Sequence, residues 1–161
     1  GWKNSGKTTL TERLVTELTA RGWRVSTVKH AHHDFDIDKP GADSFRHRMA
    51  GASEVAIVSG KRWALMHELR TEGEPSLGAI LERLAPCDII LIEGYKREDH
   101  PKIEVRRLDA GDRAPLANLD PGIVAIAADH TIPEGGLPVF SLDDVSPIAD
   151  FIEQRTGLRS A

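Results

Sequence analysis

Residues 1–8 read Gly1-Trp2-Lys3-Asn4-Ser5-Gly6-Lys7-Thr8 and match the spacing G-x-x-x-x-G-K-[ST] in full. In this motif a turn of backbone N–H groups wraps closely around a phosphate chain, so glycine is needed where a side chain would collide. The lysine reaches the terminal phosphates and the threonine hydroxyl binds Mg²⁺. The motif predicts that a nucleoside triphosphate is bound by Gly1, Asn4, Ser5, Gly6, Lys7, Thr8 and Thr9.

An amphipathic helix is expected directly after the motif. In residues 7–21 the apolar Leu10, Leu14 and Leu18 recur every four positions, and Gly22 supplies a helix stop. A phosphate-binding loop is normally fed by a buried strand of a parallel sheet, whereas this sequence begins at the first glycine of the motif. We therefore expect a truncated N-terminus, with the first strand missing and the strand edges beside it unpaired.

The composition limits the class of protein. A length of 161 residues is enough for one domain with a core, so residues 1–161 are expected to form a single P-loop nucleotide-binding domain. The net charge of −4 and the interspersed acidic and basic residues argue against nucleic acid as a partner. The sequence shows no apolar run of membrane length, and the default location is the cytoplasm. The single cysteine, Cys87, leads into an apolar strand and is interpreted as a small core residue.

Apolar strands alternate with amphipathic helices, which predicts a three-layer α/β fold of the P-loop NTPase type with a mostly parallel sheet. Continuous apolar runs at 87–92 and 123–128 are typical of buried parallel strands. Residues 53–59 and 62–69 flank Gly60-Lys61 and predict an antiparallel hairpin. The remaining expected elements are strands at 23–29, 102–108 and 139–140, and helices at 43–50, at 76–85 capped by Ser76, and from a cap at Ser146.

Ligands of parallel α/β sheets bind at the carboxyl ends of the strands. Glu93 ends one of the apolar runs and precedes Gly94. We predict that its carboxylate supports Mg²⁺ or a water bound to the ion, which would be a catalytic role. The alternative is a surface glutamate at the start of a loop.

Residues 30–38 contain three histidines and three aspartates. The spacing does not fit an EF-hand, because Lys39 stands where that loop needs glycine and Phe45 where it needs glutamate. Three interpretations stay open: a transition-metal site, a solvated loop, and a loop that senses ligand or Mg²⁺. In the third, His32 and Asp36 would contact the ligand.

The residues do not decide which base is bound. Neither Asn4 nor Asn118 begins an N-K-x-D guanine-recognition sequence. Asp129 follows the strand at 123–128 and can accept hydrogen bonds from a guanine edge, although an ordinary turn aspartate fits equally well. ATP and GTP therefore stay open on sequence chemistry. Four other basic residues are interpreted as solvated surface side chains: Lys3, Lys61, Lys96 and Arg106.

Three segments together resemble the molybdopterin-guanine dinucleotide biosynthesis protein B family, MobB. They are the phosphate-binding loop through Thr9, residues 28–44 (VKHAHHDFDIDKPGADS), and Ile92-Glu93-Gly94-Tyr95-Lys96. The resemblance spans nearly the whole chain. It implies GTP and Mg²⁺ as cofactors, a homodimer, weak GTPase activity, and an accessory role in which a MobA-like molybdenum cofactor guanylyltransferase attaches GMP to molybdopterin.

Two other classes share part of this pattern. A nickel or cobalt metallochaperone GTPase combines a P-loop with a histidine-rich segment, but it normally has a cysteine-containing metal motif. A small-molecule kinase also has a P-loop, but it normally has an arginine-rich lid. The clustered arginines do not form an obvious lid: they are Arg46, Arg48, Arg106 and Arg107.

Overall fold

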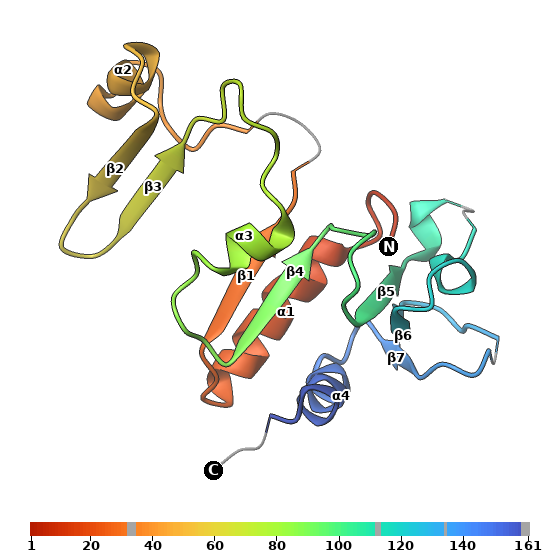
Figure 1. Cartoon of the computed structure of the whole chain (residues 1–161). Coiled ribbons are helices and arrows are strands. Elements are labelled where there is room, and N and C mark those ends of the chain that lie inside the picture. Colours follow the sequence, from red (N-terminus) through yellow and green to blue (C-terminus); the bar gives the residue numbers. More distant parts are fainter. Residues whose placement is uncertain (32–34, 112–113, 134, 159–161) are drawn as a thin grey trace. The chain divides into compact units, whose positions relative to one another are not determined.

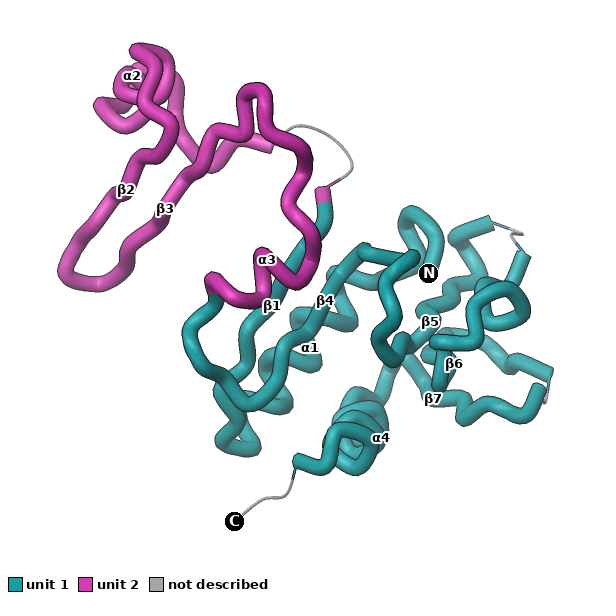
Figure 2. The backbone as a smooth tube through the Cα atoms, in the orientation of Figure 1, with its two compact units in different colours: residues 1–30, 84–161 teal, residues 31–83 magenta. Residues whose placement is uncertain are grey.

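The computed structural model describes residues 1–31, 35–111, 114–133 and 135–158. The chain divides into two compact units, shown in different colours in Figure 2. Unit 1 comprises residues 1–30 and 84–161, and unit 2 comprises residues 31–83. The phosphate-binding loop belongs to unit 1, and most of the histidine- and aspartate-rich segment belongs to unit 2.

Unit 1 is built on parallel strands (Figure 1). β1 (Val25–Lys29) pairs with β4 (Ile89–Glu93), and β6 (Ile123–Ala128) lies between β5 (Lys102–Arg106) and β7 (Val139–Ser141), all in parallel. In the described part of the chain these strands form one sheet of two strands and one of three. Parallel strands are normally covered on both faces, which explains why β4 and β6 are almost continuously apolar. The predicted α/β class is confirmed.

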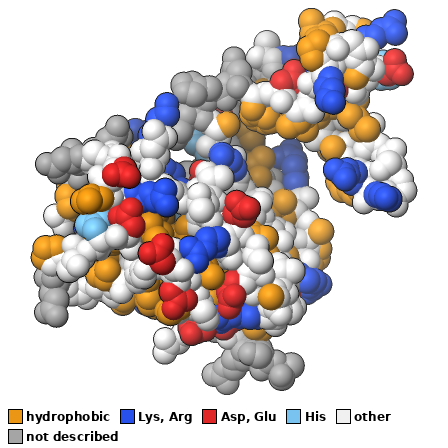
Figure 3. Space-filling model, turned by 180° about the vertical axis from the view of Figure 1, so that it is seen from behind, with side chains coloured by type: hydrophobic (Ala, Val, Ile, Leu, Met, Phe, Trp, Pro, Cys, Tyr) orange, Lys and Arg blue, Asp and Glu red, His pale blue; other side chains and the backbone are white. Residues whose placement is uncertain are grey.

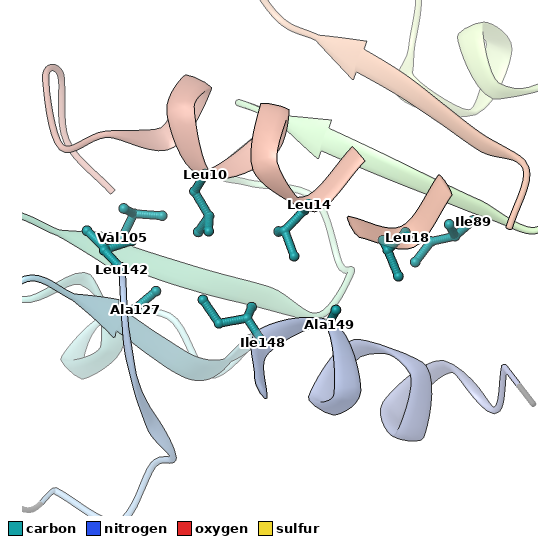
Figure 4. Packing of buried hydrophobic residues seen from close by; sticks show 9 residues of the cluster. All are labelled: Leu10, Leu14, Leu18, Ile89, Val105, Ala127, Leu142, Ile148 and Ala149. Carbon is teal, nitrogen blue, oxygen red and sulfur yellow. The ribbon is translucent and has the colours of Figure 1, made fainter. Parts of the chain in front are cut away.

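The core of unit 1 fixes the helix that carries the phosphate-binding loop. α1 (Lys7–Ala20) buries Leu10, Leu14 and Leu18 along one face, and Leu18 is fully buried. Figure 4 shows these leucines against side chains of the strands and of α4 (Ser146–Thr156), including Ile148. Burial of one leucine side chain stabilises a fold by about 1.5–3 kcal/mol. The three buried leucines, which recur every four residues, therefore fix the position of α1 and of its N-terminus.

Unit 2 contains α2 (Asp43–Met49), α3 (Leu77–Leu81) and the predicted antiparallel hairpin of β2 (Glu54–Val58) and β3 (Trp63–His67). At its turn the Ser59 hydroxyl accepts hydrogen bonds from the amides of Lys61 and Arg62. Two short 3₁₀ helices, η1 (Leu108–Ala110) and η2 (Leu116–Asn118), complete the set and lie in unit 1. None of the helices in the described ranges has the length and apolar character that a bilayer crossing needs.

Two predicted helix boundaries are wrong. α3 is capped by Ser76 as expected, but it ends at Leu81, because the Arg83 amide bonds to the Ile80 carbonyl in a tighter turn. α4 has Val145 as its N-cap and Ser146 as its first residue. The Ser146 hydroxyl accepts a hydrogen bond from Arg21 instead of capping the helix.

Candidate functional site

The phosphate-binding loop turns directly into α1. Asn4 (φ 65°) and Gly6 (φ 89°) adopt left-handed conformations, and Gly6 is the N-cap of the helix. Left-handed residues in a tight turn bring backbone N–H groups together into an anion-binding concavity. The first turn of the 14-residue helix contains no acidic side chain that would compete for its positive end. This geometry suits the phosphates of a nucleotide.

Lys7 lies at the mouth of this loop, where its ammonium donates a hydrogen bond of 2.6 Å to the Trp2 carbonyl. Burial lowers the pKa of Lys7; the Glu93 carboxylate opposes this effect, and the charges of Lys96 and Lys29 add to the lowering. Lys7, Lys29 and Lys96 thus lie near the loop, and the Glu93 carboxylate is an anion among them. A polyanion bound there would relieve their mutual repulsion and form charge-assisted hydrogen bonds.

The side chains of Thr8 and Glu93, the two residues predicted to hold Mg²⁺, lie close together. The Thr8 hydroxyl lies 3.0 Å and 3.2 Å from the two carboxylate oxygens of Glu93. β1 and β4 end at the same level, since Lys29 pairs with Glu93 in the parallel register, and the Lys29 ammonium is 3.7 Å from the same carboxylate. A hydroxyl and a carboxylate are hard oxygen ligands of the kind that Mg²⁺ prefers, so this pair fits that ion.

The backbone beside Glu93 is fixed by close contacts within unit 1. The His30 amide donates a hydrogen bond of 2.9 Å to the Glu93 carbonyl. Gly94 has φ 103°, and a Cβ on it would lie 2.7 Å from the His30 Cβ, so only glycine fits there. The rings of His30 and Tyr95 lie 4.7 Å apart. The residues after β1 and β4 are therefore locked to one another.

Asp129, the candidate guanine contact, is held by neighbours in the structure. One carboxylate oxygen accepts hydrogen bonds from the Leu108 amide at 3.0 Å and from the His130 ring at 2.8 Å. The other oxygen is 3.9 Å from Arg107 Nε. The His130 bond and then the Leu108 bond lower the pKa of Asp129, which keeps it ionised. A role toward the base stays a prediction.

The remaining predicted ligands fall in different places. Gly1 starts the loop against β5, where a Cβ would collide with the Val105 carbonyl oxygen. Asp36 belongs to unit 2, where its carboxylate accepts hydrogen bonds from the Asp38 amide at 2.9 Å and from Arg48 at 2.8 Å. His32 lies outside the described residues. Among the residues that the structure does describe, no three His, Cys, Asp or Glu side chains gather into a group that could hold a metal ion.

For three basic residues near the loop the structure gives a different result from the sequence: one was predicted to be solvated, and two were not predicted as site residues. Arg106 is not a solvated residue, because it pairs at 2.7 Å with the carboxylate of Glu104, which is buried. Lys29 and Arg107 were not predicted as site residues. Each ends or directly follows a parallel strand, so a search for cations at strand carboxyl ends could have found both.

Known proteins match this chain closely. The family model described as "MobB: Molybdopterin guanine dinucleotide synthesis protein B" matches residues 1–129. A protein of Escherichia coli (strain K12) named "Molybdopterin-guanine dinucleotide biosynthesis adapter protein" is 40% identical over 94% of this chain and 87% of its own length. A protein of the same name from Haemophilus influenzae is 39% identical over 95% of this chain and 84% of its own.

Solved structures show the same relationship. The crystal structure of a MobB protein homolog from Bacillus stearothermophilus superposes with a TM-score of 0.71 at 30% identity. The match covers 99% of this chain and 95% of that one. The agreement therefore extends from the phosphate-binding loop to the whole fold. The chain belongs to the MobB family, molybdopterin guanine dinucleotide synthesis protein B.

Proposed function

We propose that this chain is a GTP-binding adaptor of molybdenum cofactor biosynthesis. In this role it acts in the cytoplasm with a MobA-like guanylyltransferase, which attaches GMP to molybdopterin and forms molybdopterin guanine dinucleotide. The names of its relatives support the adaptor role. The observation that carries the proposal is the phosphate-binding loop at the start of α1, with Lys7 and the Thr8–Glu93 pair beside it.

The proposed roles follow from the chemistry of these groups. The loop amides and Lys7 hold the phosphates, and Thr8 and Glu93 hold Mg²⁺ directly or through water. The choice of GTP over ATP rests on the family relationship alone. Competition between the two nucleotides for the wild-type chain tests this choice, and equal affinities would refute it.

Calorimetry with GTP and Mg²⁺ tests nucleotide binding. Lys7→Ala removes a charge-assisted contact of about 1.5–3 kcal/mol, so GTP should bind about tenfold more weakly or worse. Lys61→Ala, which removes an exposed lysine in the hairpin turn, is the control and should bind normally. Unchanged GTP affinity in Lys7→Ala would place the nucleotide elsewhere. The adaptor role is tested by adding the chain to the transferase, GTP and molybdopterin, where the wild type but not Lys7→Ala should raise dinucleotide formation.

The homodimer is proposed from the hairpin of unit 2. Strand alternation places Val55 and Met66 on one face of the hairpin, where both are buried. On the other face Val58 and Trp63 are 75% and 70% exposed, and Leu65 is 48% exposed. Figure 3 shows hydrophobic side chains at the surface of unit 2, which lies at the upper right of that view. An apolar outer face on an open hairpin is typical of a protein contact, and the occupant we propose is a second copy of the chain.

Trp63→Glu tests this interface. The wild type should have the mass of a dimer in sedimentation, and the variant should shift toward the monomer with its helix content unchanged. Arg62→Glu changes the charge of the neighbouring turn residue and is the control. A dimer that persists in Trp63→Glu would show that another surface joins the copies.

A further inference from the structure

A cavity of about 350 Å³ adjoins the phosphate-binding loop in unit 1. Its wall includes Trp2 and Ser5 of the loop, residues at the end of β5, and Pro115 and His130 from the segments after β5 and β6. Pockets for small ligands have volumes of roughly 300–1,000 Å³. The cavity starts at the loop proposed to hold the phosphates and follows the carboxyl ends of parallel strands, where the rest of a nucleotide would lie.

Two residues that line this cavity each carry a buried polar atom with no hydrogen-bond partner among the described residues. The atoms are Ser5 Oγ, on a side chain that is 2% exposed, and Arg106 Nε. Buried polar atoms in folded proteins are nearly always paired, so these atoms point to a ligand that is polar in part. Glu104 on the same wall shows the contrast, because both its oxygens are occupied by Arg106 and by backbone amides.

Arg107 lies between the cavity and the loop. It lines the cavity, and its Cδ and Nε are each 3.2 Å from the position that a Cβ on Gly6 would occupy. Asp129 holds the segment that carries it, with one oxygen on the Leu108 amide and the other 3.9 Å from Arg107 Nε. A guanidinium is planar and stacks on aromatic rings, which a lysine cannot do in the same way.

We propose that the cavity holds the nucleoside part of the bound nucleotide and that Arg107 is a nucleotide-binding residue, with its guanidinium packed against the base. Asp129 is then a positioning residue that acts through Arg107 and makes no bond to the base. The inference rests on the proposed nucleotide binding at the phosphate-binding loop. It names the ligand class as a nucleoside triphosphate and does not select guanine over adenine, because every base has a face on which a planar group can stack.

Calorimetry measures the affinity of the full chain for GTP and for inorganic triphosphate, both with Mg²⁺. Comparing the two affinities separates the contribution of the nucleoside cavity from that of the phosphate-binding loop. Arg107→Ala should weaken GTP binding about tenfold, the order of effect for loss of one stacking partner, and leave triphosphate binding unchanged. Arg155→Ala, an exposed arginine in the last turn of α4, is the matched control and should change neither. Asp129→Asn should weaken GTP binding in the wild type and have no further effect in the Arg107→Ala background, which separates positioning from direct contact.

A second variant keeps the test independent of the arginine. Ala110 lines the cavity, so Ala110→Phe should fill it and weaken GTP binding while triphosphate still binds. Unchanged GTP affinity in both Arg107→Ala and Ala110→Phe would overturn the inference. An equal loss of GTP and triphosphate binding in Arg107→Ala would also overturn it, because Arg107 would then contact phosphate. Failure of the wild type to bind either ligand would overturn the proposed function, and this inference with it.

Discussion

Gly94 has a left-handed backbone conformation and lies close to a neighbouring segment. Its φ is 103°, and a Cβ would lie 2.7 Å from the Cβ of His30. Gly94→Ala should therefore destabilise the fold by about 1–3 kcal/mol through backbone strain, and by more through displacement of His30. Thermal denaturation measures the loss.

Gly22→Ala is the matched control for this prediction. Gly22 has a similar φ of 95°, but nothing lies within 4 Å of its Cβ position, so this variant carries the strain without the contact. Equal destabilisation of the two variants would show that the contact with His30 contributes nothing.

Two of the predicted site residues are marked by local features of the sequence. Thr8 is defined by its motif, and Glu93 by its place after an apolar run, and the structure joins them. Lys29 and Arg107 also stand at the carboxyl ends of strands, but that position alone does not show which side chains meet at the site. Their closeness to the site depends on strand register and on how the segment after β5 returns over Gly6. The spacing of nearby residues in the sequence predicts neither the strand register nor the path of that segment.

At the scale of elements, Arg48 links three parts of unit 2. Its guanidinium, on α2, lies 2.8 Å from Asp36 in the preceding segment and 2.6 Å from Glu68 after β3. The hydrogen bond from the Asp38 amide and then the Arg48 bond lower the pKa of Asp36, so this carboxylate stays ionised at neutral pH. Asp36 therefore has a structural role within unit 2 as the ion-pair partner of Arg48, and this role is separate from its predicted contact with a ligand.

Arg48→Met should lower the melting temperature of the protein and raise hydrogen exchange in the hairpin, because the cross-link is lost while the stem of the side chain is kept. Arg46→Met on the same helix is the control. Arg46 is exposed and has a longer contact of 3.8 Å with Asp43. An Arg48→Met melting curve that coincides with that of Arg46→Met would show that the cross-link adds no stability.

His67 joins β3 to the strand beside it and to the following turn. Its two ring nitrogens lie 2.8 Å from Glu54 and 3.1 Å from Glu72. The bond to Glu54 and then the bond to Glu72 raise the pKa of His67 above its usual 6.5. A raised pKa in the folded state means that the stability is fully present below the unfolded value and is lost as the pH rises through the folded value.

The melting temperature of the wild type should therefore fall relative to that of His67→Gln between about pH 6 and pH 8. The difference between the two proteins isolates His67 from the other histidines. His47→Gln, which replaces an exposed histidine of α2, should follow the wild type across this range. Parallel pH curves for the wild type and His67→Gln would contradict the prediction.

Helices and strands with strong local patterns were predicted well, as was the pairing of β2 with β3 in the hairpin, but the pairing of strands far apart in the sequence was not. α1 and β6 match their periodic and continuous apolar patterns closely. The pairing of β1 with β4 joins segments about sixty residues apart, and the shorter α3 ends through a local turn that its apolar pattern does not reveal. Pairing across such distances depends on the whole fold, so a local pattern carries no information on it.

For the molecule as a whole we predict slow GTP turnover. Fast hydrolysis needs a group that orients the attacking water, and the only glutamine, Gln154, lies in α4. GTPases without such groups work at about 10⁻⁴ to 10⁻³ per second, and a partner's arginine can add several powers of ten. Single-turnover rates of the isolated chain should lie near this range and rise when the transferase or its pterin substrate is added. A rate above about one per second without a partner would reveal a complete catalytic site.

The hydrogen bond between the His30 amide and the Glu93 carbonyl joins the proposed Mg²⁺ ligand Glu93 to the last residue of unit 1 before unit 2 begins. Any ligand that repositions Glu93 also acts on this junction. Linkage between two binding events is reciprocal. If bound nucleotide changes the affinity of a partner for unit 2, the bound partner must change the affinity for nucleotide by the same factor. The affinity of the chain for GTP would then report whether its partner is bound.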